Sequence, residues 1–389
     1  MPKTAKHHRD IALVTSSRAD YGHCLPILHA LTEHHHVTTR LLVTGAHLSE
    51  RFGMTAHEIE RDGWTISDRI PCLDEADTGA AMARTIGTAT SGFARALDDH
   101  PPDLLVLIAD RYEMLAPACA ATAMTIPMAH VEGGDVSEGA IDQVIRNALT
   151  MMSHVHFAPT AAAAARLRSM GEEPWRVHHA GTPSLDVLAA LTGDEINRHL
   201  AAHDLPKDGI PIIAAVHAVT LADDPIRDAR ALFSALEDVD APAVICFPNV
   251  DAGAHTIMNL ARDLCTRRDD HQIRTNLPPE AYWSLLSRAH VLVGNTSSGI
   301  MEAPALQLPS VNIGIRQHGR EQAQSVVQCE PDSSAIRAAL DQARTESFRA
   351  TLHDMVHPYG DGAAGPRIAD VLATVPLDTQ LRMKPAASI

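Results

Sequence analysis

The segment VLVGNTSSGIMEAP, residues 291–304, places small hydroxyl and glycine residues between a short apolar run and a helix. A helix N-terminus leaves several backbone N–H groups unpaired and carries partial positive charge, so Thr296, Ser297 and Ser298 can present amides and hydroxyls to a diphosphate. Glu302, one helical turn further on, can accept hydrogen bonds from both hydroxyls of a ribose. The segment therefore predicts a nucleotide-phosphate site, and taken alone it also fits an ordinary serine N-cap of a buried helix.

A second candidate anion site lies in TSSRADYG, residues 15–22, directly after the apolar run Ile11 to Val14. Arg18 stands where a strand leads into a helix, and a guanidinium is well shaped to bind phosphate there. A solvated arginine in a loop is the alternative. Two strand-to-helix anion sites about 280 residues apart predict two similar domains that close on one nucleotide.

Ionisable residues also follow three predicted strands. Asp110 and Arg111 come directly after a buried apolar run, and His217 ends the run PIIAAVHAVT. His130 and Glu132 are two residues apart, which predicts that they share one face of a strand. Because ligands of open parallel sheets bind at the carboxyl ends of the strands, we expect these groups to face a cleft.

Downstream of Glu132, Asp142 and Arg146 are spaced i, i+4 and are predicted to share one face of a helix that opens near Ala140. Each group has a simpler alternative: a surface ion pair for Asp110 and its neighbouring arginine, a cap-like acceptor for Glu132, and a solvated helix pair for Asp142 with Arg146. Four such groups in one chain with two anion sites favour a catalytic site.

The composition excludes several classes of function. A chain of 389 residues suits two α/β domains rather than one core, and its net charge of −16 argues against a nucleic-acid partner. The six cysteines form no CxxC pair, which argues against a zinc site and for a reducing compartment. No apolar run approaches the roughly 20 residues that span a bilayer, and the N-terminus has no signal-peptide pattern. We therefore expect a cytoplasmic protein with no membrane partner.

The histidine clusters at residues 7–8 and 34–36 raise the question of a metal site. We expect the second cluster to end a helix, where cations meet the helix dipole and adjacent side chains point in different directions. No metal site is therefore predicted.

Strand-like and helical runs alternate along the chain, which predicts an α/β fold of two Rossmann-like doubly wound domains facing across a cleft. The predicted strands lie near residues 10–16, 38–45, 103–109, 126–131, 154–158, 176–180, 211–217, 242–247, 291–295 and 310–313, with helices at 112–124 and 140–151. We predict an N-terminal domain over 1–185, a linker over 186–208, a nucleotide-binding domain over 209–365, and a last helix and tail over 366–389 that pack back on the first domain.

Seven ordered motifs resemble those of the hydrolysing UDP-N-acetylglucosamine 2-epimerases: TSSRADYG, ADRYEM, HVEGGDVSEGAID, PNVDAG, GNTSSGIMEAP, NIGIRQHGRE and HPYGDG. The resemblance implies a GT-B type fold and no metal or redox cofactor. It implies conversion of UDP-GlcNAc, or of a 2,4-diacetamido relative used for legionaminic acid, and water into UDP and a free 2-epimeric sugar of the N-acetylmannosamine type, which supplies sialic acid synthesis. It further implies a UDP-sugar as the bound substrate and self-association into a dimer or tetramer.

The resemblance also assigns residues. It makes Asp110, Glu132 and Asp142 catalytic with His217 assisting, and we expect Glu132 or Asp110 to remove the C2 proton as UDP leaves to give a glycal, which is then hydrated. The residues implied to bind the UDP-sugar are Arg18, Asp20, Arg111, Arg146, Asn249, Thr296, Ser297, Ser298, Gly299, Glu302, Arg316 and Arg320.

Three positions depart from the family pattern: Ala109 stands where relatives commonly have Gly, Ala218 replaces Pro, and Asn147 stands where many members have His. The last removes a titratable group beside Arg146. Three alternatives stay open. A non-hydrolysing epimerase typically has other residues after Glu132 and His217, a GT-B glycosyltransferase has no evident use for the carboxylates, and a non-catalytic nucleotide-sugar sensor is favoured only by Asn147.

Overall fold

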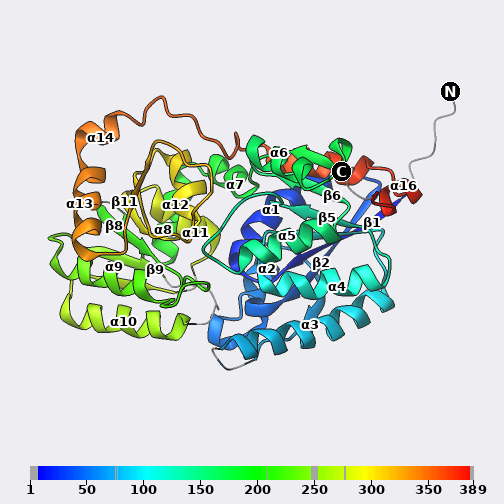
Figure 1. Cartoon of the computed structure of the whole chain (residues 1–389), viewed down its shortest axis with the longest axis horizontal. Coiled ribbons are helices and arrows are strands. Elements are labelled where there is room, and N and C mark those ends of the chain that lie inside the picture. The colour runs from blue at the N-terminus through cyan, green and yellow to red at the C-terminus, as the bar shows by residue number, and fades with distance from the viewer. Residues whose placement is uncertain are drawn as a thin grey trace.

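The computed structural model describes residues 8–385, except residues 75, 77, 208, 247–252 and 276. The fold consists of two α/β domains, each built on a parallel sheet, and they lie side by side along the long axis of the molecule (Figure 1). Both sheets are doubly wound, as the alternation of apolar runs predicts.

The first sheet has seven parallel strands in the order β3-β2-β1-β4-β5-β6-β7. Their bounds are Arg9–Thr15 (β1), Val37–Thr44 (β2), Ile66–Ile70 (β3), Leu104–Ile108 (β4), Met128–Val131 (β5), Val155–Ala158 (β6) and Val177–His179 (β7). The strand order reverses between β1 and β4, and such a switch point opens a crevice at the carboxyl ends of the strands.

Helices cover both faces of this sheet. Their bounds are Arg18–Thr32 (α1), Ala56–Arg61 (α2), Gly79–Asp99 (α3), Leu115–Ala123 (α4), Asp142–Met152 (α5) and Ala161–Ser169 (α6). Leu104, Val106 and Ile108 of β4 pack with α1 and α2, whereas Leu105 and Leu107 pack with α3, α4 and α5. Because both faces are buried, β4 is apolar at every position.

The second sheet has six parallel strands in the order β10-β9-β8-β11-β12-β13. Their bounds are Ile210–Ala215 (β8), Ala243–Cys246 (β9), Gln272–Arg274 (β10), Ala289–Gly294 (β11), Ser310–Ile313 (β12) and Val326–Cys329 (β13). The surrounding helices are Arg227–Asp238 (α9), Ala254–Arg267 (α10), Pro279–Leu286 (α11), Ser298–Met301 (α12), Ser333–Arg344 (α13) and Glu346–Ala350 (α14). The switch point here lies between β8 and β11, so each domain carries one of the two predicted anion sites at its own switch point.

Three strands lie outside the predictions from sequence, and all three are at sheet edges: β3, β10 and β13. An edge strand has one hydrogen-bonded neighbour and more exposed side chains, so a short polar run such as ISDRI or QIR lacks the apolar signal of a central strand. Between the sheets the chain forms two helices, Ser184–Ala190 (α7) and Gly193–Ala202 (α8). The linker bounds at 186 and 208 stay a prediction.

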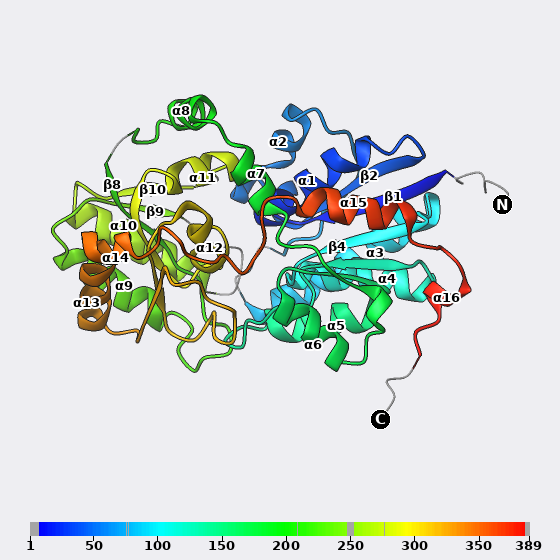
Figure 2. The ribbon, with the colours of Figure 1, turned by 90° about the horizontal axis from the view of Figure 1, so that it is seen from above.

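The C-terminal part of the chain returns to the first domain as α15, Ala364–Thr374, which packs against α1 (Figure 2). A Cβ on Gly365 would stand 2.7 Å from the carbonyl oxygen of Pro26, so only glycine allows this close approach. The carboxylate of Asp186 accepts hydrogen bonds from the backbone N–H groups of Ala364 and Gly365, at 2.8 and 2.6 Å. This contact ties the start of α15 to α7.

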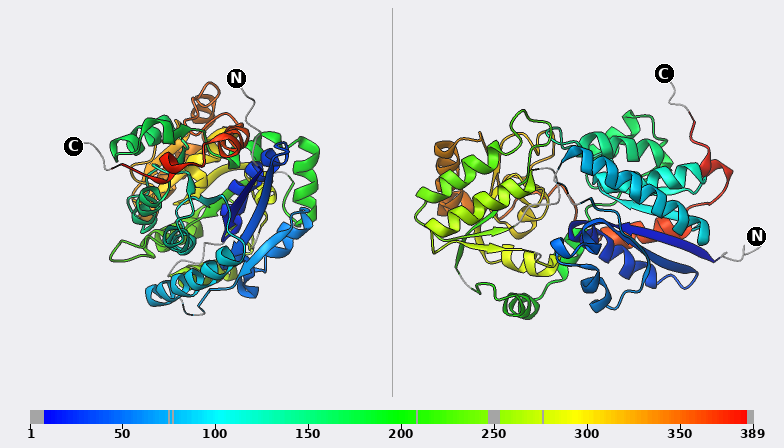
Figure 3. Two further views of the ribbon diagram at one scale, coloured as in Figure 1. Left: turned by 90° about the vertical axis from the view of Figure 1, so that its right-hand side faces the viewer. Right: turned by 90° about the horizontal axis from the view of Figure 1, so that it is seen from below.

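The segment after α15 includes α16, Thr379–Arg382, and runs along the outside of the first domain (Figure 3). The buried guanidinium of Arg176 donates to the backbone carbonyls of Gln380, Leu381 and Met383. Lys384 Nζ donates to the carbonyl of Ser153 at 2.7 Å and to Glu172 Oε1 at 2.5 Å. One buried arginine and one partly buried lysine therefore hold this segment in place.

The second histidine cluster does not end a helix as predicted, because α1 stops at Thr32 and Glu33 caps it. His34 instead pairs with Asp370 at 3.4 Å, and His36 Nε2 contacts the carbonyl oxygen of Ala373 at 3.2 Å. Both histidines thus serve the packing of α15. Within the described residues, no helix is both long and apolar enough to cross a membrane.

Candidate active site

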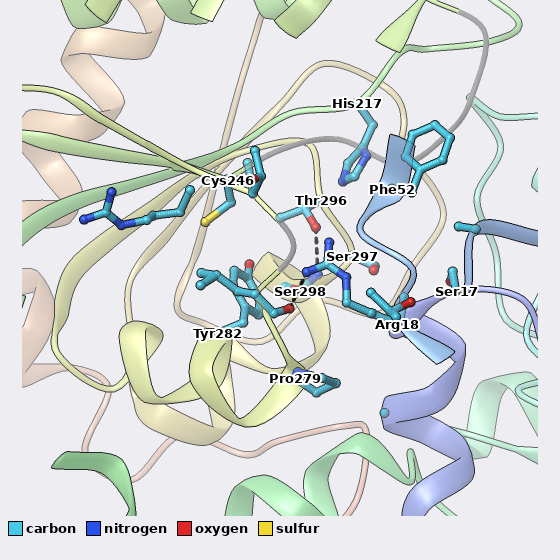
Figure 4. Close-up of a pocket in the computed structure, with 18 of the residues that line it drawn as sticks. Ser17, Arg18, Phe52, His217, Cys246, Pro279, Tyr282, Thr296, Ser297 and Ser298 are labelled. Carbon is cyan, nitrogen blue, oxygen red and sulfur yellow. Dashed lines mark hydrogen bonds between the residues drawn. The ribbon is translucent and has the colours of Figure 1, made fainter. Parts of the chain in front are cut away.

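A cavity of about 380 Å³ lies between the carboxyl ends of the two sheets. The first domain contributes the start of α1, residues 46–55 and Arg111 to its wall. The second contributes the ends of β8 and β9, the start of α11 and residues 296–298 (Figure 4). Both switch points therefore open into one site.

The turn after β1 is held by a buried carboxylate. Asp20 accepts hydrogen bonds from the Ser16 backbone N–H at 3.1 Å and from Ser16 Oγ at 2.5 Å, and Ser17 caps α1. Arg18, the first residue of α1, donates through Nη1 to the carbonyl of Leu277 at 2.6 Å in the second domain. Its side chain points toward residues 296–298 (Figure 4). Asp20 thus shapes the turn that positions Arg18 and does not line the cavity.

The turn after β11 depends on a close backbone contact. Gly294 has φ +147°, and a Cβ there would stand 1.8 Å from the carbonyl oxygen of Ala215. The next residue, Asn295, is buried and bonds both backbone groups of His217, with Oδ1 accepting from N–H at 2.7 Å and Nδ2 donating to C=O at 2.9 Å. This pair fixes the ends of β8 and β11 relative to each other, so that Thr296 enters the cavity.

The helix after this turn is shorter than the sequence predicts. α12 ends at Met301, Glu302 caps its C-terminus, and Ser297 stands at the N-cap without a side-chain capping bond. The side chain of Glu302 reaches the cavity wall, where Oε1 accepts from Ser184 Oγ at 2.8 Å. The alternative, in which the Ser297 side chain simply caps a buried helix, is therefore not supported.

Two arginines and one histidine complete the polar wall. Arg316 donates through Nη1 to the carbonyl of Asn295 at 3.1 Å, and Arg111 is buried and pairs with Glu113 at 3.0 Å. Burial, helped by Arg316 and Arg111, lowers the pKa of His217 well below its usual value. His217 is therefore a neutral imidazole near pH 7, beside two cations that can hold an anion.

Asp110 pairs with Arg146 rather than standing at the surface. Nη2 of Arg146 bonds Asp110, and Nη1 donates to Ser137 Oγ at 3.0 Å. Because Arg146 is buried, it does not form the solvated helix pair with Asp142 that was the alternative. Asp142 is the first residue of α5 and is partly exposed. Ala109 has φ +56°, a left-handed conformation that glycine adopts more readily than alanine.

Glu132 does not share a strand face with His130, contrary to the prediction. β5 ends at Val131 and Glu132 has φ +66°, so the alternation of side chains stops before it. His130 is buried and contacts the carbonyl oxygen of Ala109 at 2.8 Å, away from the cavity. Glu132 turns instead toward His23, whose Nδ1 lies 3.4 Å from Glu132 Oε1.

Glu132 is buried near two other carboxylates and one arginine. Burial and the nearby carboxylates of Asp135 and Glu302 raise the pKa of Glu132 to about 8, against the opposing effect of Arg320. Arg320 does not line the cavity; its Nε pairs with Asp135 Oδ2 at 3.0 Å and donates to the carbonyl of Val136 at 2.7 Å, joining the two domains. Glu132 thus holds its proton near neutral pH.

The predicted residues that line the cavity are Arg18, Arg111, His217, Thr296, Ser297, Ser298, Glu302 and Arg316. Those outside its lining are Asp20, Asp110, Glu132, Asp142, Arg146, Gly299 and Arg320. Asn249 lies outside the described residues. The prediction omits several polar residues of the wall, including His23, Arg262, Arg274 and Tyr282. For His23 a signal exists, because residues 18, 19, 22 and 23 share one face of a helix.

Comparisons with known proteins place this site in context. The family model described as UDP-N-acetylglucosamine 2-epimerase matches residues 29–373. A relative from Legionella pneumophila, named UDP-N,N'-diacetylbacillosamine 2-epimerase (hydrolyzing), is 32% identical over 381 residues, which are 97% of this chain and 98% of the relative. A relative from Campylobacter jejuni, named GDP/UDP-N,N'-diacetylbacillosamine 2-epimerase (hydrolyzing), is 30% identical and covers 88% of this chain and 89% of its own.

Among solved structures, UDP-GlcNAc 2-epimerase from Neisseria meningitidis bound to UDP-GlcNAc matches with a TM-score of 0.78 and 16% identity. The match covers 93% of this chain and 99% of that structure. This likeness extends over both domains and confirms the GT-B type fold.

Proposed function

The chain belongs to the UDP-N-acetylglucosamine 2-epimerase family and is a UDP-sugar 2-epimerase, and from this premise we propose that it is a hydrolysing enzyme. It would convert a UDP-2-acetamido sugar and water into UDP and the free 2-epimeric sugar. The observation that supports the hydrolysing type most directly is the similarity over nearly the full chain to two relatives whose names specify hydrolysis.

The proposed substrate is UDP-GlcNAc or a 2,4-diacetamido relative. The names of the Legionella and Campylobacter proteins favour the diacetamido sugar, UDP-N,N'-diacetylbacillosamine. With UDP-GlcNAc, the free product would be N-acetylmannosamine.

The first chemical step is departure of UDP. The C2 proton of the sugar is barely acidic, so loosening the C1–O bond first builds oxocarbenium character that makes the proton easier to remove. The leaving diphosphate gathers negative charge, which Arg18, Arg316 and the amides and hydroxyls of residues 296–298 are placed to stabilise.

Removal of the C2 proton completes the elimination to a 2-acetamidoglucal. We assign the base to the carboxylate of Glu132 or Asp110, and Arg146 holds Asp110 in position. Addition of water across the double bond then places the hydrogen on the opposite face of C2. We propose that Asp142 and His217 assist in these proton transfers.

Proton NMR in deuterium oxide tests this function. The purified protein is incubated in parallel with UDP-GlcNAc and with UDP-N,N'-diacetylbacillosamine, and Asp110→Asn is run beside each as an inactive control. The expected result is UDP together with a free 2-epimeric sugar that carries deuterium at C2. Formation of an epimeric UDP-sugar without UDP would assign the non-hydrolysing reaction instead.

The same preparations address the predicted homo-oligomer. We propose that the chain forms a dimer or tetramer, and multi-angle light scattering measures the mass directly. A monomeric mass at assay concentrations would contradict this proposal.

A further inference from the structure

His23 lines the cavity from the second turn of α1, the helix that begins at Arg18. Its Nδ1 atom lies 3.4 Å from Oε1 of Glu132, and the two side chains are only 12% and 7% exposed. Both atoms are buried, and neither makes a hydrogen bond to a described residue. Two orphaned polar atoms therefore face each other at the edge of the cavity.

Glu132 itself does not line the cavity, whereas His23 does. The two nitrogens of an imidazole lie on opposite edges of the ring, so when Nδ1 faces Glu132, Nε2 remains for the cavity. A sugar in the cavity can therefore touch His23, and Glu132 is reached through it. This arrangement of a base oriented by a buried carboxyl group is a recurring one in proton transfer.

In place of direct removal of the C2 proton by Glu132 or Asp110, we propose that His23 removes this proton and that Glu132 acts through His23, as its orienting partner and proton acceptor. The C2 proton transfer follows from the 2-epimerase activity alone. The order in which the bonds break rests on the proposed hydrolysing function.

The step balances as follows. With Glu132 ionised and His23 neutral, the C2 proton moves to Nε2, and the C2–H electron pair forms the C1=C2 double bond. The C1–O bond breaks, and its electron pair leaves with the diphosphate oxygen of UDP. The Nδ1 proton passes to Oε1 of Glu132, so His23 ends the step neutral in its other tautomer. In the later hydration step, a different donor delivers a proton to the opposite face of C2.

The electrostatics of the pair agree with this role. Burial lowers the pKa of His23, against the effect of Glu302 and Asp20, so the imidazole is neutral and can accept a proton. Asp135, Glu302 and Arg320 face Glu132, and its pKa of about 8 means that the ionised form becomes abundant as pH rises. The reaction should therefore speed up between pH 7 and 9.

Kinetics of His23→Gln and His23→Ala test the proposal, with His29→Gln as a matched control on the exposed part of α1. A lost general base lowers kcat by about 10²–10⁴-fold, and we expect a loss in this range for His23→Gln with KM changed by less than about threefold. The rise of kcat/KM near pH 8 should vanish in His23→Gln and in Glu132→Gln alike. Added imidazole should restore part of the activity of His23→Ala but not of Glu132→Gln.

The double variant His23→Gln with Glu132→Gln separates coupled from independent roles. If Glu132 acts through His23, the double variant is no slower than the worse single variant. Multiplied losses, an unchanged kcat in His23→Gln, or a loss confined to KM would overturn the proposal. Deuterium exchange at C2 is measured beside UDP release, so a parent enzyme that exchanges C2 but releases no UDP would refute the hydrolysing function while still reporting on His23.

Discussion

Replacing Glu132 by glutamine should make the protein more stable at alkaline pH. Burial and the carboxylate of Asp135 raise the pKa of Glu132 from its usual 4.5 to about 8 in the folded protein. The protonated Glu132 side chain contributes stability that is fully present below pH 4.5, the pKa in the unfolded chain. This contribution is lost as pH rises through 8, the pKa in the folded protein. Glutamine has no proton to lose, so the variant escapes the cost of a buried negative charge.

The size of the effect follows from the same shift. Each factor of ten in the proton equilibrium corresponds to about 1.4 kcal/mol, so ionising Glu132 in the folded state costs roughly 5 kcal/mol above pH 8. The difference in free energy of unfolding between Glu132→Gln and the parent should grow in the variant's favour by up to about 5 kcal/mol between pH 4.5 and pH 9. The variant should be inactive over the same range, because it lacks the carboxylate that we propose takes part in the C2 proton transfer.

Urea unfolding curves at pH 4.5, 7 and 9, at constant ionic strength, measure this difference. Glu33→Gln, at an exposed carboxylate, serves as the control and should show no such trend. A constant difference between Glu132→Gln and the parent across the three pH values would refute the reasoning, because it would mean that Glu132 ionises as freely in the folded protein as in the unfolded chain.

Three further substitutions probe other parts of the site and its support. Arg18→Gln should raise KM for the UDP-sugar by about tenfold or more in steady-state kinetics, because a charge-assisted phosphate contact is lost; an unchanged KM would place the diphosphate elsewhere. Arg146→Lys should lower kcat by about tenfold or more with little change in KM, since lysine cannot bond both Asp110 and Ser137 with one planar group; a purely binding defect would contradict this. Lys384→Met should lower the free energy of unfolding by roughly 2 kcal/mol, because Lys384 Nζ donates hydrogen bonds to the backbone carbonyls at the end of α5. Thermal unfolding measures this change. A midpoint equal to that of the parent would show that the C-terminal segment is loosely held.

The central strands could be predicted from sequence because a strand that is buried on both faces needs apolar residues at every position. Leu104 to Ile108 is apolar at every position, and such a run has few alternatives to a central parallel strand. The edge strands β3, β10 and β13 could not be predicted, since their partners along the sheet, rather than their own side chains, determine that they are strands.

The positions of the two predicted anion sites follow from the sequence for a similar local reason. A strand that runs into small polar residues and then a helix has its amides and side chains oriented by the turn itself, so Arg18 and residues 296–298 are found in the cavity where the motifs place them. The length of the helix after residue 297 was not predictable, because Glu302 ends it and bonds Ser184 from the connection between the domains.

The alternating apolar runs and the order of the motifs were thus enough to specify two doubly wound domains and the residue types that meet between them. Which groups touch was decided by packing between segments far apart in the chain. Arg146 pairs with Asp110 rather than using its neighbour Asp142, and Glu132 leaves the face of His130 because its backbone turns left-handed. The contact of His23 with Glu132, and the burial that keeps Glu132 protonated near pH 7, arise only when α1 and the end of β5 come together, since proximity and dielectric environment are properties of the folded chain.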